Sequence, residues 1–156
     1  MKFAFTTALV SLAGLVSATV LPRQSCPDAS RFGILAISSP TNATSYSPGD
    51  PINVHVDFHC AVTNYDIVPQ FIDYTIEVPA NQNNGHEAPI VLARRTLAAG
   101  ATTDEFSTTI PFAFYFAGAP YNVVLTDTYP VEGTDGTSQF LLEGSVEVPI
   151  TINGST

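Results

Sequence analysis

The polarity pattern of the chain consists of short apolar runs separated by residues that form turns. After an apolar leader, runs rich in β-branched and aromatic residues alternate with clusters of Pro, Gly, Asn, Asp and Ser. No apolar period of 3.6 residues continues far enough to predict a long helix. The pattern therefore predicts an all-β domain, with candidate strands at residues 31–38, 51–60, 71–79, 89–97, 105–111, 121–126, 138–142 and 145–152.

The clearest alternation lies in the run 51–60. One face of a strand there would carry Val54, Val56, Phe58 and Cys60, and the other would carry Asn53, His55, Asp57 and His59. A strand with one apolar and one polar face is typical of an antiparallel sheet with one wet side. Seven or eight such strands over residues 24–156 predict a single immunoglobulin- or fibronectin-like antiparallel β-sandwich.

The first residues have the features of a secretory leader. Lys2 precedes the apolar stretch 3–16, and Val16-Ser17-Ala18 fits a small-residue cleavage site, so residues 1–18 are expected to be a signal peptide. Residues 19–23 end in Arg23 and form a candidate pro-segment, whose removal would leave Gln24 first. The expected localisation is secreted and extracellular.

The charge balance limits the classes of partner. The chain has 5 Lys and Arg against 14 Asp and Glu, a formal net charge of −9. These few cations cannot build the basic patch that nucleic acid requires, and the acidic surface repels anionic membranes. We therefore expect neither nucleic acid nor membranes as partners. The expected partner is a cell-wall polysaccharide or an extracellular protein, and the chain is expected to be a monomer.

Cysteines and sequons fit an extracellular protein. Cys26 and Cys60 are the two cysteines, and an even count in a secreted chain predicts a disulfide. Closing a loop of this length would stabilise the fold by about 4 kcal/mol. Asn42 and Asn153 each begin an Asn-x-Ser/Thr sequon and are the candidate N-glycosylation sites.

One strand offers a candidate pair of ligands for a metal ion. In His55-x-Asp57-x-His59, the first two side chains would point the same way at about 7 Å and could share an ion. His55 and His59 would be about 13 Å apart, so a third ligand would have to come from another strand. The favoured alternative is a polar outer face with cross-strand partners. No cofactor is expected.

Catalytic motifs are missing from the sequence. There is no Gly-x-Ser-x-Gly elbow, zinc-protease His-Glu-x-x-His or phosphate-binding Gly-rich loop. Copper-dependent polysaccharide oxygenases need a histidine as the mature N-terminus, and the plausible starts here are Thr19, Gln24 and Ser25. Acid pairs that a glycosidase could use include Asp104 with Glu105, but acids on a small sandwich are ordinarily solvated. We therefore expect that the protein is not an enzyme.

Aromatic residues concentrate in the segment 111–121. Alternation would place Phe112, Phe114 and Phe116 together on a core face, with Tyr115 opposite. Tyr115 and Tyr121 are then the candidate ligand-binding platform, because an exposed flat ring can stack on a sugar. Core packing of the whole segment is the favoured alternative.

Two resemblances extend these expectations. The run 37–56 resembles the opening of the immunoglobulin-like domain in fungal cell-wall proteins linked to β-1,6-glucan assembly. That resemblance supports the sandwich fold more than a function, and a module that binds cell-wall polysaccharide is the alternative function. The leader, single Arg site, short length and missing catalytic motifs are also similar to those of small secreted, effector-like proteins of mushroom-forming fungi. This second resemblance implies a non-catalytic role in fungal development or in the secreted lignocellulose-degrading programme.

Overall fold

The computed structural model describes residues 25–85 and 87–155, and the expected signal peptide and pro-segment lie outside these ranges. Within them, seven strands and two short helices follow one another along the chain. They are η1 (Asp28–Ser30), β1 (Ile34–Ser38), β2 (Pro51–Asp57), α1 (His59–Asn64), β3 (Phe71–Glu77), β4 (Ile90–Arg95), β5 (Thr103–Thr109), β6 (Tyr121–Glu132) and β7 (Gln139–Ile150). None of the helices in the described ranges is long and apolar enough to span a membrane.

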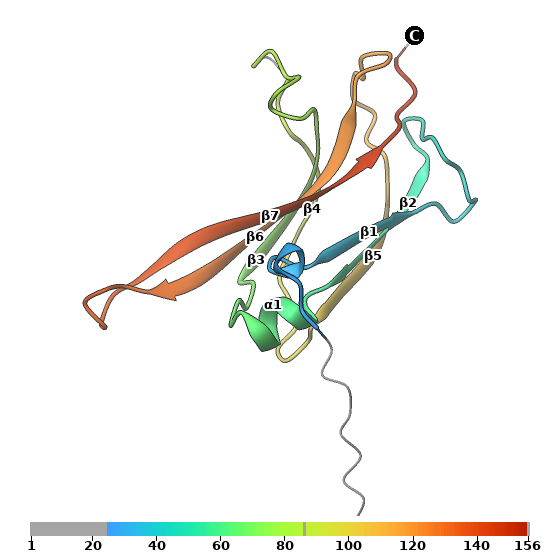
Figure 1. Cartoon of the computed structure of the whole chain (residues 1–156). Coiled ribbons are helices and arrows are strands. Elements are labelled where there is room, and N and C mark those ends of the chain that lie inside the picture. Colours follow the sequence, from blue (N-terminus) through green and yellow to red (C-terminus); the bar gives the residue numbers. More distant parts are fainter. Residues whose placement is uncertain (1–24, 86, 156) are drawn as a thin grey trace, which may run out of the picture.

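The strands form two antiparallel sheets. One has the order β1-β2-β5 and the other the order β4-β3-β6-β7 (Figure 1). This arrangement confirms the predicted immunoglobulin- or fibronectin-like antiparallel β-sandwich. The fourth strand pairs with β3, whereas in immunoglobulin constant domains the fourth strand belongs to the first sheet.

The core lies between the sheets and follows the alternation of the strands. Val54 and Val56 of β2 are fully buried, as the sequence predicts, while His55 between them is exposed. Facing them from the second sheet are fully buried residues at every second position of β3 and β6, namely Ile72, Tyr74, Val123 and Leu125. Burial of these side chains supplies the main driving force for folding.

The second strand ends earlier than predicted. β2 stops at Asp57, and both His59 and Cys60 lie in α1 rather than on the strand. The reason is local: Asp57 Oδ1 accepts a hydrogen bond from the backbone N–H of His59 at 2.7 Å, and this satisfies one of the free amides at the start of α1. The predicted Cys26–Cys60 disulfide is confirmed, and it joins the N-terminal segment to α1 rather than to a central strand.

The last two candidate strands are a single strand in the structure. β7 runs from Gln139 to Ile150 without a break, and β6 continues to Glu132 instead of ending at residue 126. The described strands therefore number seven, not eight. Pairing of β6 with β3 ends at Phe71 and Thr128, whereas pairing of β6 with β7 continues to Glu132 and Gln139. The hairpin residues 129–142 beyond that point form a projecting two-stranded ribbon, here called the arm (Figure 1).

Candidate functional site

The aromatic segment before β6 lies at the end of the sandwich opposite the arm, with the β1–β2 and β3–β4 connections. Its tyrosines and phenylalanines are arranged opposite to the prediction. Tyr115 and Tyr121 are buried, whereas Phe112, Phe114 and Phe116 are 87%, 63% and 54% exposed. The expected tyrosine platform is therefore wrong, because the two rings are not accessible to a ligand.

Long-range hydrogen bonds explain which side of the segment faces inward. The backbone N–H of Tyr115 donates to Ser155 Oγ at 3.0 Å, and the N–H of Ser155 donates to the carbonyl of Tyr115 at 2.8 Å. The segment is thus attached to the C-terminal residues by its Tyr115 side. The two tyrosine rings then pack edge to face with their centroids 5.4 Å apart, which leaves the phenylalanines outside.

A pocket of about 620 Å³ opens beside the exposed phenylalanines. Phe114 and Phe116 line it from the segment before β6, and their rings meet edge to face at 4.9 Å. The β3–β4 connection lines it with amide side chains that include Gln82 and Asn83. Sequence reasoning missed this site, although the amide-rich run 81–84 and the aromatic run 112–116 were both visible as local signals.

The Tyr121 hydroxyl forms a hydrogen bond with each of the two walls of this pocket. It donates to Glu87 Oε1 at 2.8 Å and accepts a hydrogen bond from the backbone N–H of Phe116 at 2.9 Å. Burial, together with the Glu87 carboxylate, raises the pKa of Tyr121 to about 12, so the phenol stays protonated at neutral pH. Asn83 Nδ2 donates to the carbonyl of Glu87 at 2.8 Å, and this hydrogen bond links two residues of the wall formed by the β3–β4 connection.

Both predicted glycan acceptors lie on the surface near this end. Asn42 is exposed and has a φ of 56° in the β1–β2 connection. Asn153 is exposed in the C-terminal segment, where its Nδ2 donates to Ser47 Oγ at 2.9 Å. Their glycosylation stays a prediction.

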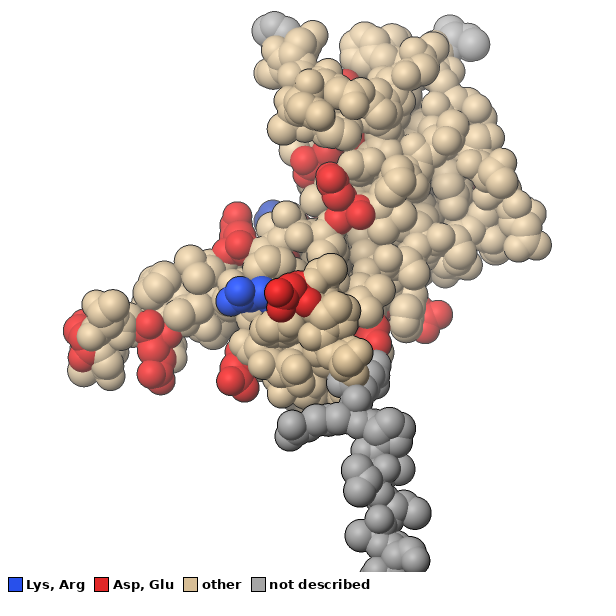
Figure 2. All heavy atoms as spheres, in the orientation of Figure 1, with Lys and Arg blue, Asp and Glu red and all other residues tan. Residues whose placement is uncertain are grey.

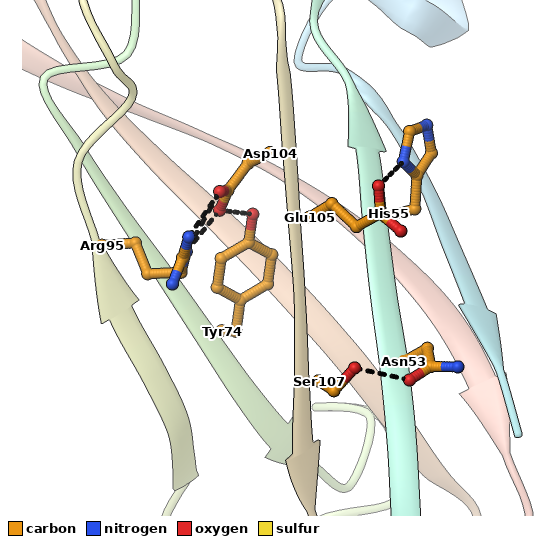
Figure 3. A network of polar contacts seen from close by, with 7 residues as sticks. All are labelled: Asn53, His55, Tyr74, Arg95, Asp104, Glu105 and Ser107. Carbon is orange, nitrogen blue, oxygen red and sulfur yellow. Dashed lines mark hydrogen bonds and ion pairs between the residues drawn. The ribbon is translucent and has the colours of Figure 1, made fainter. Parts of the chain in front are cut away.

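The outer face of β2 makes cross-strand contacts with β5. His55 Nδ1 lies 4.0 Å from Glu105 Oε2, and Ser107 Oγ donates to Asn53 Oδ1 at 2.7 Å (Figure 3). Both pairs are direct register partners of the two strands. The carboxylate of Asp57 instead accepts a hydrogen bond from the first backbone N–H of α1. Over residues 25–85 and 87–155, no three His, Cys, Asp or Glu side chains cluster to hold a metal ion, so the structure does not bring a third ligand to His55 and Asp57.

Asp104 and Glu105 point to opposite sides of β5 and do not form an acid pair (Figure 3). Asp104 is buried between the sheets, where Arg95 Nε and Nη2 donate to its carboxylate at 2.8–3.0 Å. The hydroxyl of Tyr74 donates to Asp104 Oδ2 at 2.9 Å. Since burial and the Asp104 charge raise the pKa of Tyr74 well above its usual range, this phenol remains a donor. The network joins β3 and β4 of one sheet to β5 of the other.

Asp127 is a second buried carboxyl, on the core face of β6. It is completely buried, and neither carboxylate oxygen has a hydrogen-bond partner of good geometry among the described residues. Burial raises its pKa to about 7, and the nearby backbone amides of Asp127 and Gly144 offset this increase only in part. The residue lies away from the pocket, so it offers no acid for chemistry there.

The chain matches no protein-family model, no curated protein and no solved structure. The protein is therefore classified by its fold, which is an antiparallel β-sandwich with a pocket at one end lined by aromatic and amide side chains.

Proposed function

We propose that the protein is secreted and non-catalytic and that it binds a neutral cell-wall polysaccharide, β-glucan in particular, at the pocket of Phe114 and Phe116. The observation that carries the proposal is the exposure of these two rings beside a wall of amide side chains. Large aromatic side chains are normally buried, so paired exposed rings at a pocket mark a binding surface.

The two walls supply the two kinds of contact that a sugar needs. A pyranose ring presents C–H groups on its flat faces, and these pack on aromatic rings such as Phe114 and Phe116. Its hydroxyl groups both donate and accept hydrogen bonds around the rim. Amides such as Gln82 and Asn83 also do both, so they match hydroxyls better than a charged group would.

Charge favours a neutral ligand over an acidic one. Glu87 is the one charged side chain among the described residues that line the pocket, and its carboxylate is bonded to Tyr121. The end of the sandwich that holds the pocket shows mostly uncharged surface in Figure 2. With a net charge of −9, the chain as a whole would repel polyanionic polymers at low salt.

Secretion is part of the proposal and has independent support. The Cys26–Cys60 disulfide is of the kind that persists in oxidising compartments, and both sequons are exposed. The role in fungal development or in the lignocellulose-degrading programme stays a prediction from resemblance, since no residue of the structure carries it.

The test is depletion of the glycosylated protein from solution by insoluble β-glucan, chitin and cellulose. We expect saturable binding to β-glucan, and the double variant Phe114→Ala/Phe116→Ala should weaken it by at least about tenfold, because each ring contributes about 1 kcal/mol. Phe112→Ala is the matched control, since this ring is in the same segment and even more exposed but does not line the pocket. No soluble sugar should be released.

Three results would contradict the proposal. Wild-type protein with an intact disulfide that is depleted by none of the polymers would remove polysaccharide binding. Equal loss of binding in Phe112→Ala would remove the assignment to this pocket. Release of soluble sugar during the incubation would show that the protein is catalytic.

A further inference from the structure

The two walls of the pocket are attached to the sandwich in different ways. The aromatic wall is tied to the C-terminal residues, because the backbone N–H and carbonyl of Tyr115 both bond to Ser155. Ala117 of the same wall packs on Gly154 so closely that a Cβ on the glycine would collide with it. The aromatic wall therefore has a fixed position on the sandwich.

The amide wall, which the β3–β4 connection forms, makes local hydrogen bonds. The backbone N–H groups of Gln82 and Asn83 both donate to the carbonyl of Pro79. Asn83 Nδ2 donates to the carbonyl of Glu87, and Asn83 Oδ1 accepts a hydrogen bond from the N–H of Gly85 at 2.8 Å. These bonds shape the connection, but they do not set its distance from the aromatic wall.

A chain of two hydrogen bonds crosses from one wall to the other through Tyr121. The backbone N–H of Phe116 donates to the Tyr121 hydroxyl at 2.9 Å, and this hydroxyl donates to Glu87 Oε1 at 2.8 Å. Tyr121 is 1% exposed, so water has almost no access to its hydroxyl. Because the hydroxyl carries a single proton, accepting from Phe116 leaves that proton for Glu87, and the two bonds strengthen each other.

We propose that the Tyr121 hydroxyl is a positioning group that holds the amide wall at the distance from the Phe114 and Phe116 rings at which one pyranose ring contacts both walls. This inference rests on the proposed binding of polysaccharide at the same pocket. Tyr121 is buried and does not line this pocket, so its hydroxyl acts through Glu87 and the backbone of Phe116. A wall that is held in place before the sugar arrives loses less conformational entropy on binding.

Tyr121→Phe tests this role with the smallest change, because it removes the hydroxyl and keeps the ring. In depletion of the full mature chain by insoluble β-glucan, we expect it to weaken binding by at least about tenfold. Tyr115→Phe is the matched control. The Tyr115 ring is equally buried and packs on that of Tyr121, but its hydroxyl donates within the aromatic wall, to the carbonyl of Pro111 at 3.2 Å. This variant also loses a buried hydrogen bond, yet it should bind β-glucan within about twofold of the wild type.

Variants of Glu87 separate positioning from direct contact with the sugar, because this side chain also lines the pocket. Glu87→Gln keeps an oxygen that can accept from Tyr121, so it should retain binding. Glu87→Ala breaks the link and should weaken binding about as much as Tyr121→Phe does. Since both changes break one link, the double variant Tyr121→Phe/Glu87→Ala should lose no more than the larger single loss. Losses that multiply would show that the two residues act independently and would overturn the proposal.

Amide hydrogen exchange of the free protein gives a readout that needs no ligand. Tyr121→Phe should increase exchange in the β3–β4 connection, whereas Tyr115→Phe should leave it unchanged. Equal effects of the two variants, on exchange or on binding, would overturn the positioning role.

The binding assay also separates this inference from the proposed function. Loss of binding in Phe114→Ala/Phe116→Ala together with normal binding in Tyr121→Phe would overturn the positioning role and leave the polysaccharide pocket intact. Normal binding in Phe114→Ala/Phe116→Ala would instead contradict the pocket assignment. Circular dichroism of each variant separates loss of binding from loss of fold.

Discussion

The guanidinium of Arg95 and the carboxylate of Asp104 connect the two sheets of the sandwich through three hydrogen bonds of 2.8–3.0 Å. Arg95 ends β4 in one sheet, and Asp104 lies in β5 of the other. The cation also lies over the Phe106 ring, 4.8 Å from its centroid. Because the side chain of Asp104 is 8% exposed, the hydrogen bonds from Arg95 and Tyr74 replace the water contacts that its carboxylate loses on burial.

Removing this charge should destabilise the protein measurably. We expect Asp104→Asn to lower the free energy of unfolding by about 2–4 kcal/mol, since it leaves the guanidinium partly buried without its counter-ion. The control is Asp73→Asn, which breaks the surface pair with Arg94, whose side chain is 74% exposed. That change should have a much smaller effect, because solvent screens the charges of this pair. Urea unfolding followed by tyrosine fluorescence measures the free energy of unfolding of both variants. Equal losses would show that the pair between the sheets stabilises the fold no more than the surface pair does.

Asp127 should make stability fall as pH rises. Its pKa is about 7 in the folded protein and about 3.9 when unfolded, so folding favours the protonated form. The stability associated with the protonated form of Asp127 is fully present below about pH 4 and is lost progressively as the pH rises through 7. Asp127→Asn removes this titration, so the stability of the variant relative to wild type should increase by about 2–4 kcal/mol between pH 4 and pH 8. Unfolding midpoints measured across that range test this expectation, and a constant difference would contradict it.

Gly144 and Phe32 should be strongly coupled. A Cβ on Gly144 would collide with the Phe32 ring, which packs directly on the glycine in β7. Gly144→Ala should therefore destabilise the protein by about 1–3 kcal/mol. In a Phe32→Ala background the same substitution should cost little, because the obstructing ring is gone. A double-mutant cycle of thermal unfolding gives the coupling free energy between the two residues. Strictly additive effects would contradict the contact between Gly144 and the Phe32 ring.

Much of the fold followed from local patterns in the sequence. The alternation around Val54 and Val56 predicted the core face of β2, and the turn clusters predicted most strand boundaries. The disulfide followed from the count of two cysteines, which allows only one pairing within the chain. Helix α1 was missed because Asp57 binds the His59 amide, and this side-chain contact leaves no trace in the polarity pattern.

The candidate site could not be predicted in the same way. Alternation correctly separated Tyr115 from Phe114 and Phe116, but the expectation that the phenylalanines face the core was wrong. That choice depends on Ser155, forty residues further along the chain, and the position of Tyr121 depends on Glu87. The pocket likewise requires the β3–β4 connection and the segment before β6 to meet at one end of the sandwich.

The sequence by itself determined the fold class, the core alternation and the disulfide, because these depend on residue type and on the period of two along a strand. Only the tertiary structure decided which aromatic rings are exposed, that Asp104 pairs with Arg95 across the sheets, and that the β6–β7 hairpin extends beyond β3 as an arm. The physical reason is that these features arise from contacts between segments distant in sequence. The free energy of such contacts is set by how the sheets stack, and no local pattern records it.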